Sequence, residues 1–278
     1  MLLLCGSHRL DLSTPLVMGV LNVTPDSFSD GGRYAHVDAA VAHALRMIAE
    51  GAALIDIGGE STRPGAQAVD ADEEIRRVVP VIEALAARAK VLISVDTSKP
   101  AVMIAAVRAG ATLINDVRAL REPGALEAAA ASGAAVCLMH MQGEPRTMQV
   151  DPRYGDVVAE VRDFLHARAE RCMAAGIARD RLVLDPGIGF GKRLEHNLAL
   201  LAALPALVAL GWPVLVGVSR KSMFDALLGR AVDERVAGGV EMAKAAVLSG
   251  ASIVRTHDVA PTVDAVKVAT ALKAAGTL

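Results

Sequence analysis

Short apolar runs recur along the chain, and each follows a stretch whose apolar positions have helical spacing. In the first such stretch, one helical face carries five apolar residues: Val37, Val41, Ala44, Leu45 and Ile48. Gly51 comes next, and a glycine after a helix readily takes the left-handed conformation that ends it. The run that follows, Ala53–Ile57, is short and apolar, as is typical of a buried strand. Helix, glycine and strand in this order indicate the alternation of a parallel sheet.

The same order repeats along the chain. Gly51–Ile57 resembles Gly110–Asp116, Gly133–Leu138 and Gly250–Arg255. We interpret eight apolar runs as strands: Leu16–Val20, Ala53–Ile57, Leu92–Val95, Leu113–Ile114, Ala135–Met139, Leu182–Leu184, Val214–Val218 and Ile253–Val254. Eight strand–helix units in 278 residues predict an α/β fold of the (β/α)8 TIM barrel type.

We expect residues 1–278 to form a single barrel domain, because no linker separates the units. The segment before Pro15 is left over and is expected to form a short hairpin at the barrel base. The alternative is a doubly wound open sheet, which would need a Gly-x-Gly-x-x-Gly turn after its first strand. Val20–Pro25 is not such a turn.

Proline and glycine positions predict where two of the helices begin and end. Pro100 and Gly110 are expected to begin and end one of them. Asp151 and Pro152 have the residue types of an N-cap and first position for the longest helix, which Gly176 then ends.

The stretch Leu198–Val218 has no charged residue and is long enough to cross a membrane. Pro205, Gly211 and Pro213 interrupt it. We therefore interpret it as a core helix, a Gly-Trp-Pro turn and a buried strand.

Composition and charge narrow the functional classes. Hydrophobic residues make up 53% of the chain and aromatic residues only 3%, so Ala, Val and Leu fill the core. The formal net charge is −2, and the sequence has no run of Lys and Arg that would cover a nucleic-acid backbone. We expect no nucleic-acid partner, and an anionic ligand must be held by a few placed groups.

The cysteines indicate a reducing compartment. Cys5, Cys137 and Cys172 are odd in number and widely spaced, which disfavours a disulfide framework or a zinc site. The apolar run at the start of the chain is too short for a signal peptide. We expect a cytoplasmic protein with no membrane partner.

Each predicted strand ends in a residue or turn suited to chemistry or recognition: Asn22, Gly58–Glu60, Asp96, Asn115, His140, Asp185, Ser219 and Arg255. Active sites of (β/α)8 barrels are built from strand ends and βα loops at this face. Polar loops are common on any surface, but carboxylates and amides directly after Val95, Ile114 and Leu184 indicate a functional site.

Two βα loops are long and rich in Gly, Ser and Pro, which is typical of mobile lids. They are Asn22–Gly32 and Gly58–Gly65. In the second loop, Thr62 and Arg63 are candidates to hold a phosphate, because arginine offers a forked set of donors. The alternative is a solvated loop with a surface arginine.

Two further segments suit an anionic ligand. Phosphate sites in barrels are common after strands seven and eight, where Ser219–Ser222 and Arg255–Asp258 fall, and Arg255 with His257 forms a candidate anion site. The glycines of Asp185–Lys192 would let a backbone approach a ligand closely. That segment is one residue short of a Walker A motif and has no Ser or Thr after Lys192, so we reject a nucleotide-triphosphate site.

Taken in order, these motifs resemble the signatures of the dihydropteroate synthases. The matching segments are Met18–Gly32, Gly59–Gly65, Ser94–Lys99, Asn115–Asp116, Met139–Gly143, Asp185–Gly187 and Ser219–Ser222. The match spans about Pro15 to Asp258 in family order, and the two longest motifs are highly specific. Thr256, where valine is usual, and Ile188 are mild departures.

The resemblance implies a reaction that joins 4-aminobenzoate to (7,8-dihydropterin-6-yl)methyl diphosphate, giving 7,8-dihydropteroate and pyrophosphate for folate synthesis. On this basis Asp185 accepts from the pterin amino group and ring N–H, and Lys221 donates to the ring carbonyl. Asn115 donates and accepts at the ring, Asp96 accepts from ring nitrogens, and Met139 contacts the flat face.

The resemblance also implies how the leaving group is held. Arg63, Arg255 and His257 would bind the pyrophosphate together with a Mg²⁺ cofactor held partly by Asn22. Asp96 would stabilise the cation that develops on the pterin methylene. The implied catalytic residues are Asp96, Lys221, Arg63, Arg255 and His257.

The 4-aminobenzoate pocket is implied to form from Phe28, Pro64, Phe190 and Ser222, with Lys221 close by. Sulfonamides compete at this pocket in the family. The family also suggests a homodimer through outer helices, for which the apolar positions near Val240–Val247 are candidates.

Two other functions stay open on the sequence. One is a pterin-dependent methyltransferase barrel, which shares the pterin-side residues but does not need Thr62, Arg63 or Ser222. The other is a non-catalytic paralogue that only binds pterins.

Overall fold

The computed structural model describes residues 1–24, 33–61, 68–144 and 147–276 of the chain. Its strands are β1 (Leu2–Cys5), β2 (His8–Asp11), β3 (Leu16–Asn22), β4 (Leu54–Gly58), β5 (Leu92–Asp96), β6 (Leu113–Asp116), β7 (Ala135–Met139), β8 (Leu182–Asp185), β9 (Leu215–Gly217) and β10 (Ile253–Thr256). Its α-helices are α1 (Arg33–Ala49), α2 (Ala71–Arg88), α3 (Pro100–Ala109), α4 (Ala125–Ser132), α5 (Val157–Ala174), α6 (Leu194–Ala202), α7 (Leu204–Val208), α8 (Met223–Leu228), α9 (Val236–Leu248) and α10 (Val259–Ala274).

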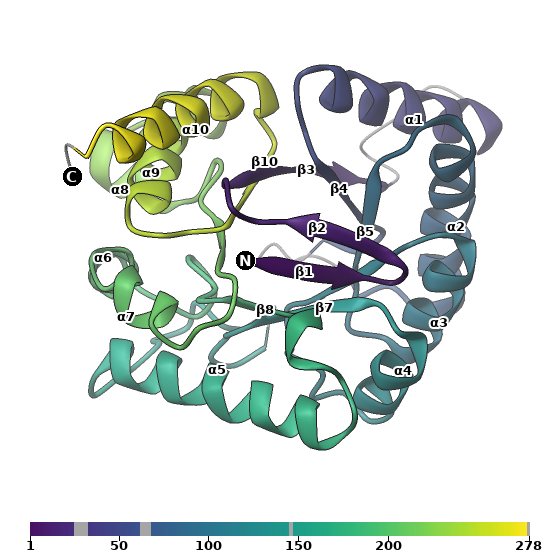
Figure 1. Cartoon of the computed structure of the whole chain (residues 1–278), viewed down its shortest axis with the longest axis horizontal. Helices are drawn as coiled ribbons and strands as arrows, with labels where there is room; N and C mark the ends of the chain where they lie inside the picture. The colour runs from purple at the N-terminus through teal and green to yellow at the C-terminus, as the bar shows by residue number, and fades with distance from the viewer. Residues whose placement is uncertain (25–32, 62–67, 145–146, 277–278) are drawn as a thin grey trace.

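Strands β3 to β10 form one parallel sheet that closes on itself. The strand order is β8-β7-β6-β5-β4-β3-β10-β9. A parallel bridge between Leu184 and Val214 joins the two ends of this order, and the Leu184 amide donates to the Pro213 carbonyl over 2.9 Å. Helices surround the closed sheet (Figure 1). The predicted (β/α)8 barrel is therefore confirmed.

Alternation along each strand divides the core into an outer and an inner layer. On β4, Ile55 and Ile57 join the apolar cluster that includes the helices, whereas Leu54 joins a separate cluster inside the barrel. This is the two-residue period of a pleated strand. Asp56 shares the inward face and is completely buried, so the barrel interior is not apolar throughout.

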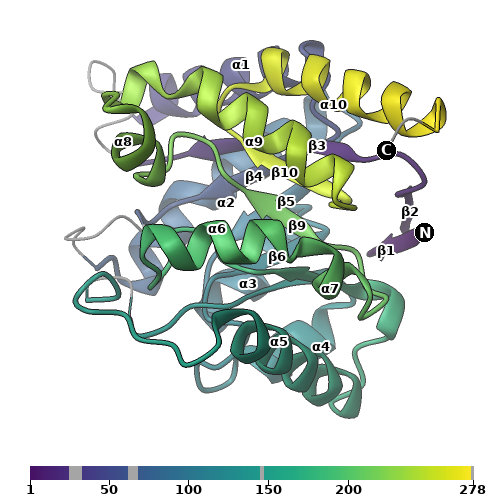
Figure 2. The ribbon, with the colours of Figure 1, turned by 90° about the vertical axis from the view of Figure 1, so that its left-hand side faces the viewer.

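The predicted hairpin at the barrel base is confirmed. β1 and β2 pair antiparallel around Gly6, whose φ of 61° suits a glycine. Leu3 and Cys5 are completely buried and pack with Met18 and other inward-facing residues from the starts of the barrel strands. The hairpin lies across this end of the barrel (Figures 1 and 2). The apolar floor leaves the opposite end for ligand chemistry.

One predicted helix start is wrong. Pro100 and Gly110 do begin and end α3 as expected. However, α5 begins at Val157, because the Asp156 carboxylate caps its first turn. Asp151 and Pro152 lie outside the helix, and the Asp151 backbone has a φ of 53°. The prediction failed because two acidic residues offered the same capping chemistry only a few positions apart.

The uncharged stretch from Leu198 to Val218 forms most of α6, then α7 and β9, as the proline and glycine positions predict. Within the described ranges, no helix combines the length and the apolar character that a membrane crossing requires.

The apolar positions proposed for subunit contact are largely used within the chain. Ala243, Ala246 and Val247 on α9 are buried, and α9 packs closely on α10 (Figure 1). These three side chains are therefore not available for the proposed subunit contact, and the homodimer itself stays a prediction. A helical face that looks free in sequence is here the face that packs on the next helix.

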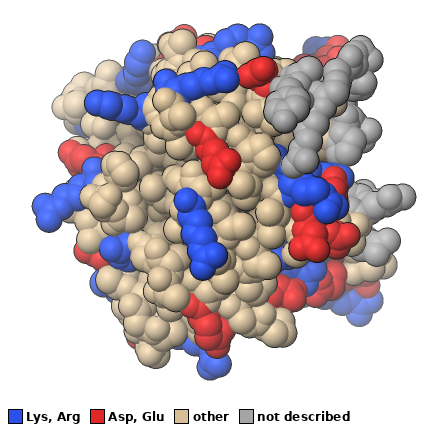
Figure 3. Space-filling model, turned by 90° about the vertical axis from the view of Figure 1, so that its right-hand side faces the viewer, with Lys and Arg blue, Asp and Glu red and all other residues tan. Residues whose placement is uncertain are grey.

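Acidic and basic side chains intermingle on the side of the barrel covered by α2 and α3 (Figure 3). The pairs Arg76–Glu73 and Arg77–Glu73 on α2, each at 2.8 Å, illustrate this mixing. Where this face is made of described residues, it carries no band of a single charge.

Candidate active site

Side chains from the carboxyl ends of the barrel strands line one inner cavity. Because the strands are parallel, their carboxyl ends all lie at the same end of the barrel. The cavity is lined by Asp96, Asn115, Val117, Met139, Asp185, Gly187, Ile188, Phe190, Gly217, Lys221 and Arg255. All the residues proposed to bind the pterin ring are in this set, and their binding roles remain predictions.

A buried network joins three of the polar groups through a residue that sequence reasoning missed. The Oδ2 atom of Asp56 accepts from Arg255 Nε over 2.6 Å and from Asn115 Nδ2 over 2.9 Å. Arg255 Nη2 also donates to Asp96 Oδ2 over 2.8 Å. Asp56 thus fixes the orientation of Asn115 and Arg255, two residues of the cavity, from inside the barrel. An acid within the apolar run Ala53–Ile57 was the available signal.

Burial and charge set the protonation of this network. Burial raises the pKa of Asp96 to about 7, although the Arg255 guanidinium lowers it. Burial alone would lower the pKa of Arg255. The carboxylates of Asp56 and Asp96 raise this pKa by more than burial lowers it, so Arg255 stays charged. Asp96 is therefore close to its midpoint at neutral pH.

Asp185 and Lys221 form the other polar side of the cavity. Burial raises the pKa of Asp185, against the Gly187 amide that donates to its Oδ1 over 2.7 Å. Burial lowers the pKa of Lys221 to about 8, although Asp185 raises it. The Lys221 ammonium lies 4.2 Å from the centre of the Phe190 ring, a cation–π distance. Both groups thus carry a desolvation cost that a polar ligand would reduce.

The glycine-rich segment after β8 is packed against protein. A Cβ at Gly187 would lie 1.9 Å from the His140 carbonyl oxygen, and one at Gly191 would lie 2.3 Å from the Gln142 carbonyl oxygen. Gly191 does not line the cavity, so it serves packing within the protein rather than close approach to a ligand. Gly187 does line the cavity, and its close approach to a ligand stays a prediction. Both glycines are needed because the segments after β7 and β8 touch backbone to backbone. Lys192, at the end of the segment, is 3% exposed.

Arg255 and His257, the candidate anion site, have different surroundings. Arg255 is engaged with carboxylates inside the barrel. The His257 ring contacts Ser219 Oγ at 3.1 Å, and burial together with Arg255 lowers its pKa to about 4. His257 is therefore neutral at pH 7 and offers a hydrogen bond rather than a charge.

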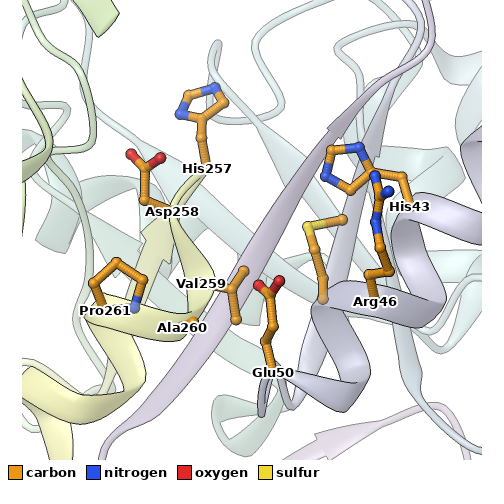
Figure 4. Close-up of a pocket in the computed structure, with 9 residues that line it drawn as sticks. His43, Arg46, Glu50, His257, Asp258, Val259, Ala260 and Pro261 are labelled. Carbon is orange, nitrogen blue, oxygen red and sulfur yellow. The ribbon is translucent and has the colours of Figure 1, made fainter. Parts of the chain in front are cut away.

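A second, larger cavity of about 320 Å³ lies outside the barrel, between α1 and the start of α10. Figure 4 shows His257 and Asp258 on one side and His43, Arg46 and Glu50 on the other. We place the chemistry in the inner cavity despite its smaller size, because the perturbed carboxylates and Lys221 converge there.

The remaining predicted residues lie near the mouth or outside the described residues. Asn22 ends β3 and is exposed, as is Ser222, which precedes α8. Four residues lie outside the described part of the chain: Phe28, Thr62, Arg63 and Pro64.

The mouth offers only a sparse site for a metal ion. In the described ranges there is no cluster of three or more His, Cys, Asp or Glu residues suited to holding one. Asn22 Oδ1 and Asp96 Oδ2 lie 3.9 and 3.8 Å from where a Gly58 Cβ would be, so they flank the same glycine. Oxygen donors of this kind, few in number, fit a Mg²⁺ ion that takes its other ligands from a diphosphate and water.

Comparisons with known proteins agree with this geometry. A family model described as pterin binding enzyme matches residues 18–257. The dihydropteroate synthase of Escherichia coli (strain K12) is 55% identical over 268 residues, which are 96% of this chain and 95% of that protein. The dihydropteroate synthase of Haemophilus influenzae is 51% identical, over 96% of this chain and 98% of its own length.

Solved structures give the same result. The Yersinia pestis dihydropteroate synthase with a sulfonamide drug has a TM-score of 0.94 and 55% identity, covering 99% of this chain and 100% of that one. The Xanthomonas albilineans enzyme in complex with 7,8-dihydropteroate has a TM-score of 0.90 and 52% identity, covering 99% of both chains. The barrel and its polar mouth thus define a pterin-binding enzyme. Within that class, the chain belongs to the dihydropteroate synthases, which are transferases.

Proposed function

We propose that this chain joins 4-aminobenzoate to (7,8-dihydropterin-6-yl)methyl diphosphate, releasing pyrophosphate and forming 7,8-dihydropteroate. The observation that carries the proposal is the inner cavity, where Asp96, Asn115, Asp185 and Lys221 converge. Among its solved relatives, one Xanthomonas albilineans structure holds 4-aminobenzoic acid and another holds 7,8-dihydropteroate.

The pterin ring would lie in this cavity with its polar edge towards Asp185. An amino group and a ring N–H together need a two-point acceptor, which a carboxylate provides. Lys221 would donate to the ring carbonyl, and Asn115 and Asp96 would bond the ring nitrogens. Met139 is 3% exposed and would offer its sulfur to the flat face.

Breaking the C–O bond sends the electron pair to pyrophosphate and leaves positive charge on the pterin methylene. Asp96, when ionised, would stabilise that charge from within the barrel. Arg255 lies beside Asp96 and would bind the departing anion, with His257 and Arg63 as further donors. When bound at Asn22, Mg²⁺ would neutralise charge on the diphosphate.

The arylamine would then attack the methylene carbon, forming the C–N bond and losing a proton. Its nitrogen is already a nucleophile, so no activated serine or cysteine is required. Phe190 and Ser222 would shape the 4-aminobenzoate pocket near Lys221, together with Phe28 and Pro64. This is where a sulfonamide would compete.

An assay of pyrophosphate release tests the proposal. With the pterin diphosphate and Mg²⁺, release should be fast only when 4-aminobenzoate is present, and chelation of Mg²⁺ should abolish it. The Asn22→Ala variant should need about tenfold more Mg²⁺, because it loses a ligand. Pyrophosphate release at the same rate with and without 4-aminobenzoate would contradict the proposal. Pterin binding without any pyrophosphate release would indicate a non-catalytic paralogue.

We propose that the chain works as a homodimer through the surface of α8 and α10. Exposed apolar residues on and after these helices support this choice: Leu227, Leu228, Val232, Val268 and Leu272. Side chains of this kind favour contact with a second copy over contact with water. Sedimentation of the wild type should give a dimer, and a Leu228→Glu/Val268→Glu double variant should sediment as a monomer. A monomeric wild type at micromolar concentration would refute this.

We infer a cytoplasmic location from the cysteines. Cys5, Cys137 and Cys172 are all buried free thiols, as a reducing compartment would keep them. Fractionation that recovers the protein outside the cytoplasm would count against this.

A further inference from the structure

We propose that Lys192 is a positioning residue for the pterin site. Its side-chain amine ties the β8 loop (residues 186–192) to the β7 loop (residues 140–143) and thereby fixes the orientation of Asp185 and Phe190. This inference rests on the proposed function of the inner cavity, and it gives a role to a lysine that does not line that cavity.

The Lys192 ammonium lies among four acceptors. Its Nζ atom is 2.9 Å from the Gly187 carbonyl oxygen, 3.0 Å from that of Phe190 and 3.2 Å from that of His140. It is also 3.0 Å from His140 Nδ1. Burial and the nearby Lys192 lower the pKa of His140 to about 3, so its ring is neutral and Nδ1 can accept. Burial lowers the pKa of Lys192 itself to about 7, although Asp185 raises it, and Nζ keeps N–H donors in either protonation state. The Lys192 amine is thus shared between the two loops.

The β8 loop connects the Lys192 contacts to Asp185 and Lys221, two residues proposed to bind the pterin. The Gly187 amide donates to Asp185 Oδ1 over 2.7 Å. Three residues further on, the Phe190 ring lies against the Lys221 ammonium. Lys192 holds the carbonyls of these same two loop residues, Gly187 and Phe190. Movement of the loop would therefore displace both the acid and the lysine predicted to bind the pterin.

Side chains without charge make other hydrogen bonds to the β8 loop. The Tyr154 hydroxyl donates to the Gly191 carbonyl oxygen over 2.8 Å, and Gln149 Nε2 donates to that of Gly189 over 2.5 Å. Asn197 Oδ1 accepts from the Gly189 amide over 2.7 Å. Lys192 differs from these because it is buried and donates to three carbonyls, those of His140, Gly187 and Phe190. The Gly187 carbonyl also accepts from the Phe190 amide over 3.0 Å. Loss of the amine would therefore cost most at the carbonyls of His140 and Phe190.

The Lys192→Met variant tests the proposal, because methionine keeps the length of the side chain but removes its donors. Titration calorimetry with 6-hydroxymethyl-7,8-dihydropterin should show a Kd raised about tenfold or more. The Kd for pyrophosphate with Mg²⁺, whose proposed site does not involve the β8 loop, should stay within about twofold. A merely structural role would weaken both ligands alike.

Two further variants make the outcome decisive. Lys267→Met removes an exposed lysine of α10 and should leave both Kd values unchanged. Tyr154→Phe removes only the Tyr154 hydroxyl and should raise the pterin Kd about threefold, even if Lys192→Met does not fold. Unchanged pterin binding in Tyr154→Phe and in any folded Lys192→Met, or equal losses for pterin and pyrophosphate, would overturn the inference. Failure of the wild type to bind the pterin would instead overturn the proposed function.

Discussion

The Asp185→Asn variant is expected to bind the pterin about a hundredfold more weakly than the wild type, the scale seen when one partner of a buried charged pair is lost. The carboxylate offers two acceptors to a pair of donors, whereas the amide offers one acceptor and one donor. Asparagine can still accept from the Gly187 amide, so the β8 loop should keep its place. Titration calorimetry with the 6-hydroxymethyl pterin measures the change.

The stability of the folded protein should not fall with the pterin affinity in Asp185→Asn, and it should stay the same or rise. Burial raises the pKa of Asp185, which means that its ionised form is costly in the folded protein without a ligand. Asp185→Asn should therefore unfold at the same urea concentration as the wild type or a higher one. Asp180→Asn, an exposed acid at the base of the barrel, is the matched control and should change neither quantity. Unchanged pterin affinity in Asp185→Asn would remove this residue from the site.

The Asp96→Asn variant is expected to lower kcat by about 10²–10³-fold, the scale of losing one electrostatic stabiliser of a transition state. Pterin affinity should fall by less than about tenfold, because the amide can still bond the ring. Arg255 keeps Asp56 as a partner, so the interior should remain folded. Single-turnover kinetics and calorimetry on the same preparation separate the two effects. Equal losses in both would mean that Asp96 only binds the substrate.

The same residue predicts a pH dependence. Burial raises the pKa of Asp96 to about 7, so the carboxylate is mostly protonated below that pH and mostly ionised above it. If the ionised form stabilises the cation, kcat/KM should rise with pH through about 7. Asp96→Asn should lose the part of this rise in kcat/KM that comes from ionisation of Asp96. The part that comes from ionisation of the substrate diphosphate should remain in the variant.

The barrel could be predicted because its determinants are local. Leu54–Gly58 alternates between two apolar layers, and Gly110 ends its helix in a conformation that glycine favours. Closure of the barrel depends on the pairing of Leu184 with Val214, two residues that are far apart in sequence. Here the regular repetition of units was sufficient, since eight units of this kind have one compact closed arrangement.

The site was predictable only in part, because its second layer depends on contacts between distant strands. The residues at strand ends were identified by their position after apolar runs. Asp56 was missed because its partners, Asn115 and Arg255, come from other strands. In the sequence, Lys192 stands only at the end of a glycine-rich segment that is one residue short of a Walker A motif. No local pattern indicates that its amine reaches carbonyls on two loops.

The apolar hairpin and the side chains packed on it close the base of the barrel. Substrates must then enter, and products must leave, at the end of the barrel where the strands have their carboxyl ends. In the proposed arrangement, a bicyclic ring against Asp185 would occupy the deeper position, and an arylamine nearer the rim would cover its exit. If the two ligands bind at these proposed depths, the ring would have to bind before the amine. A compound that fills the outer position would hold the ring in place beneath it.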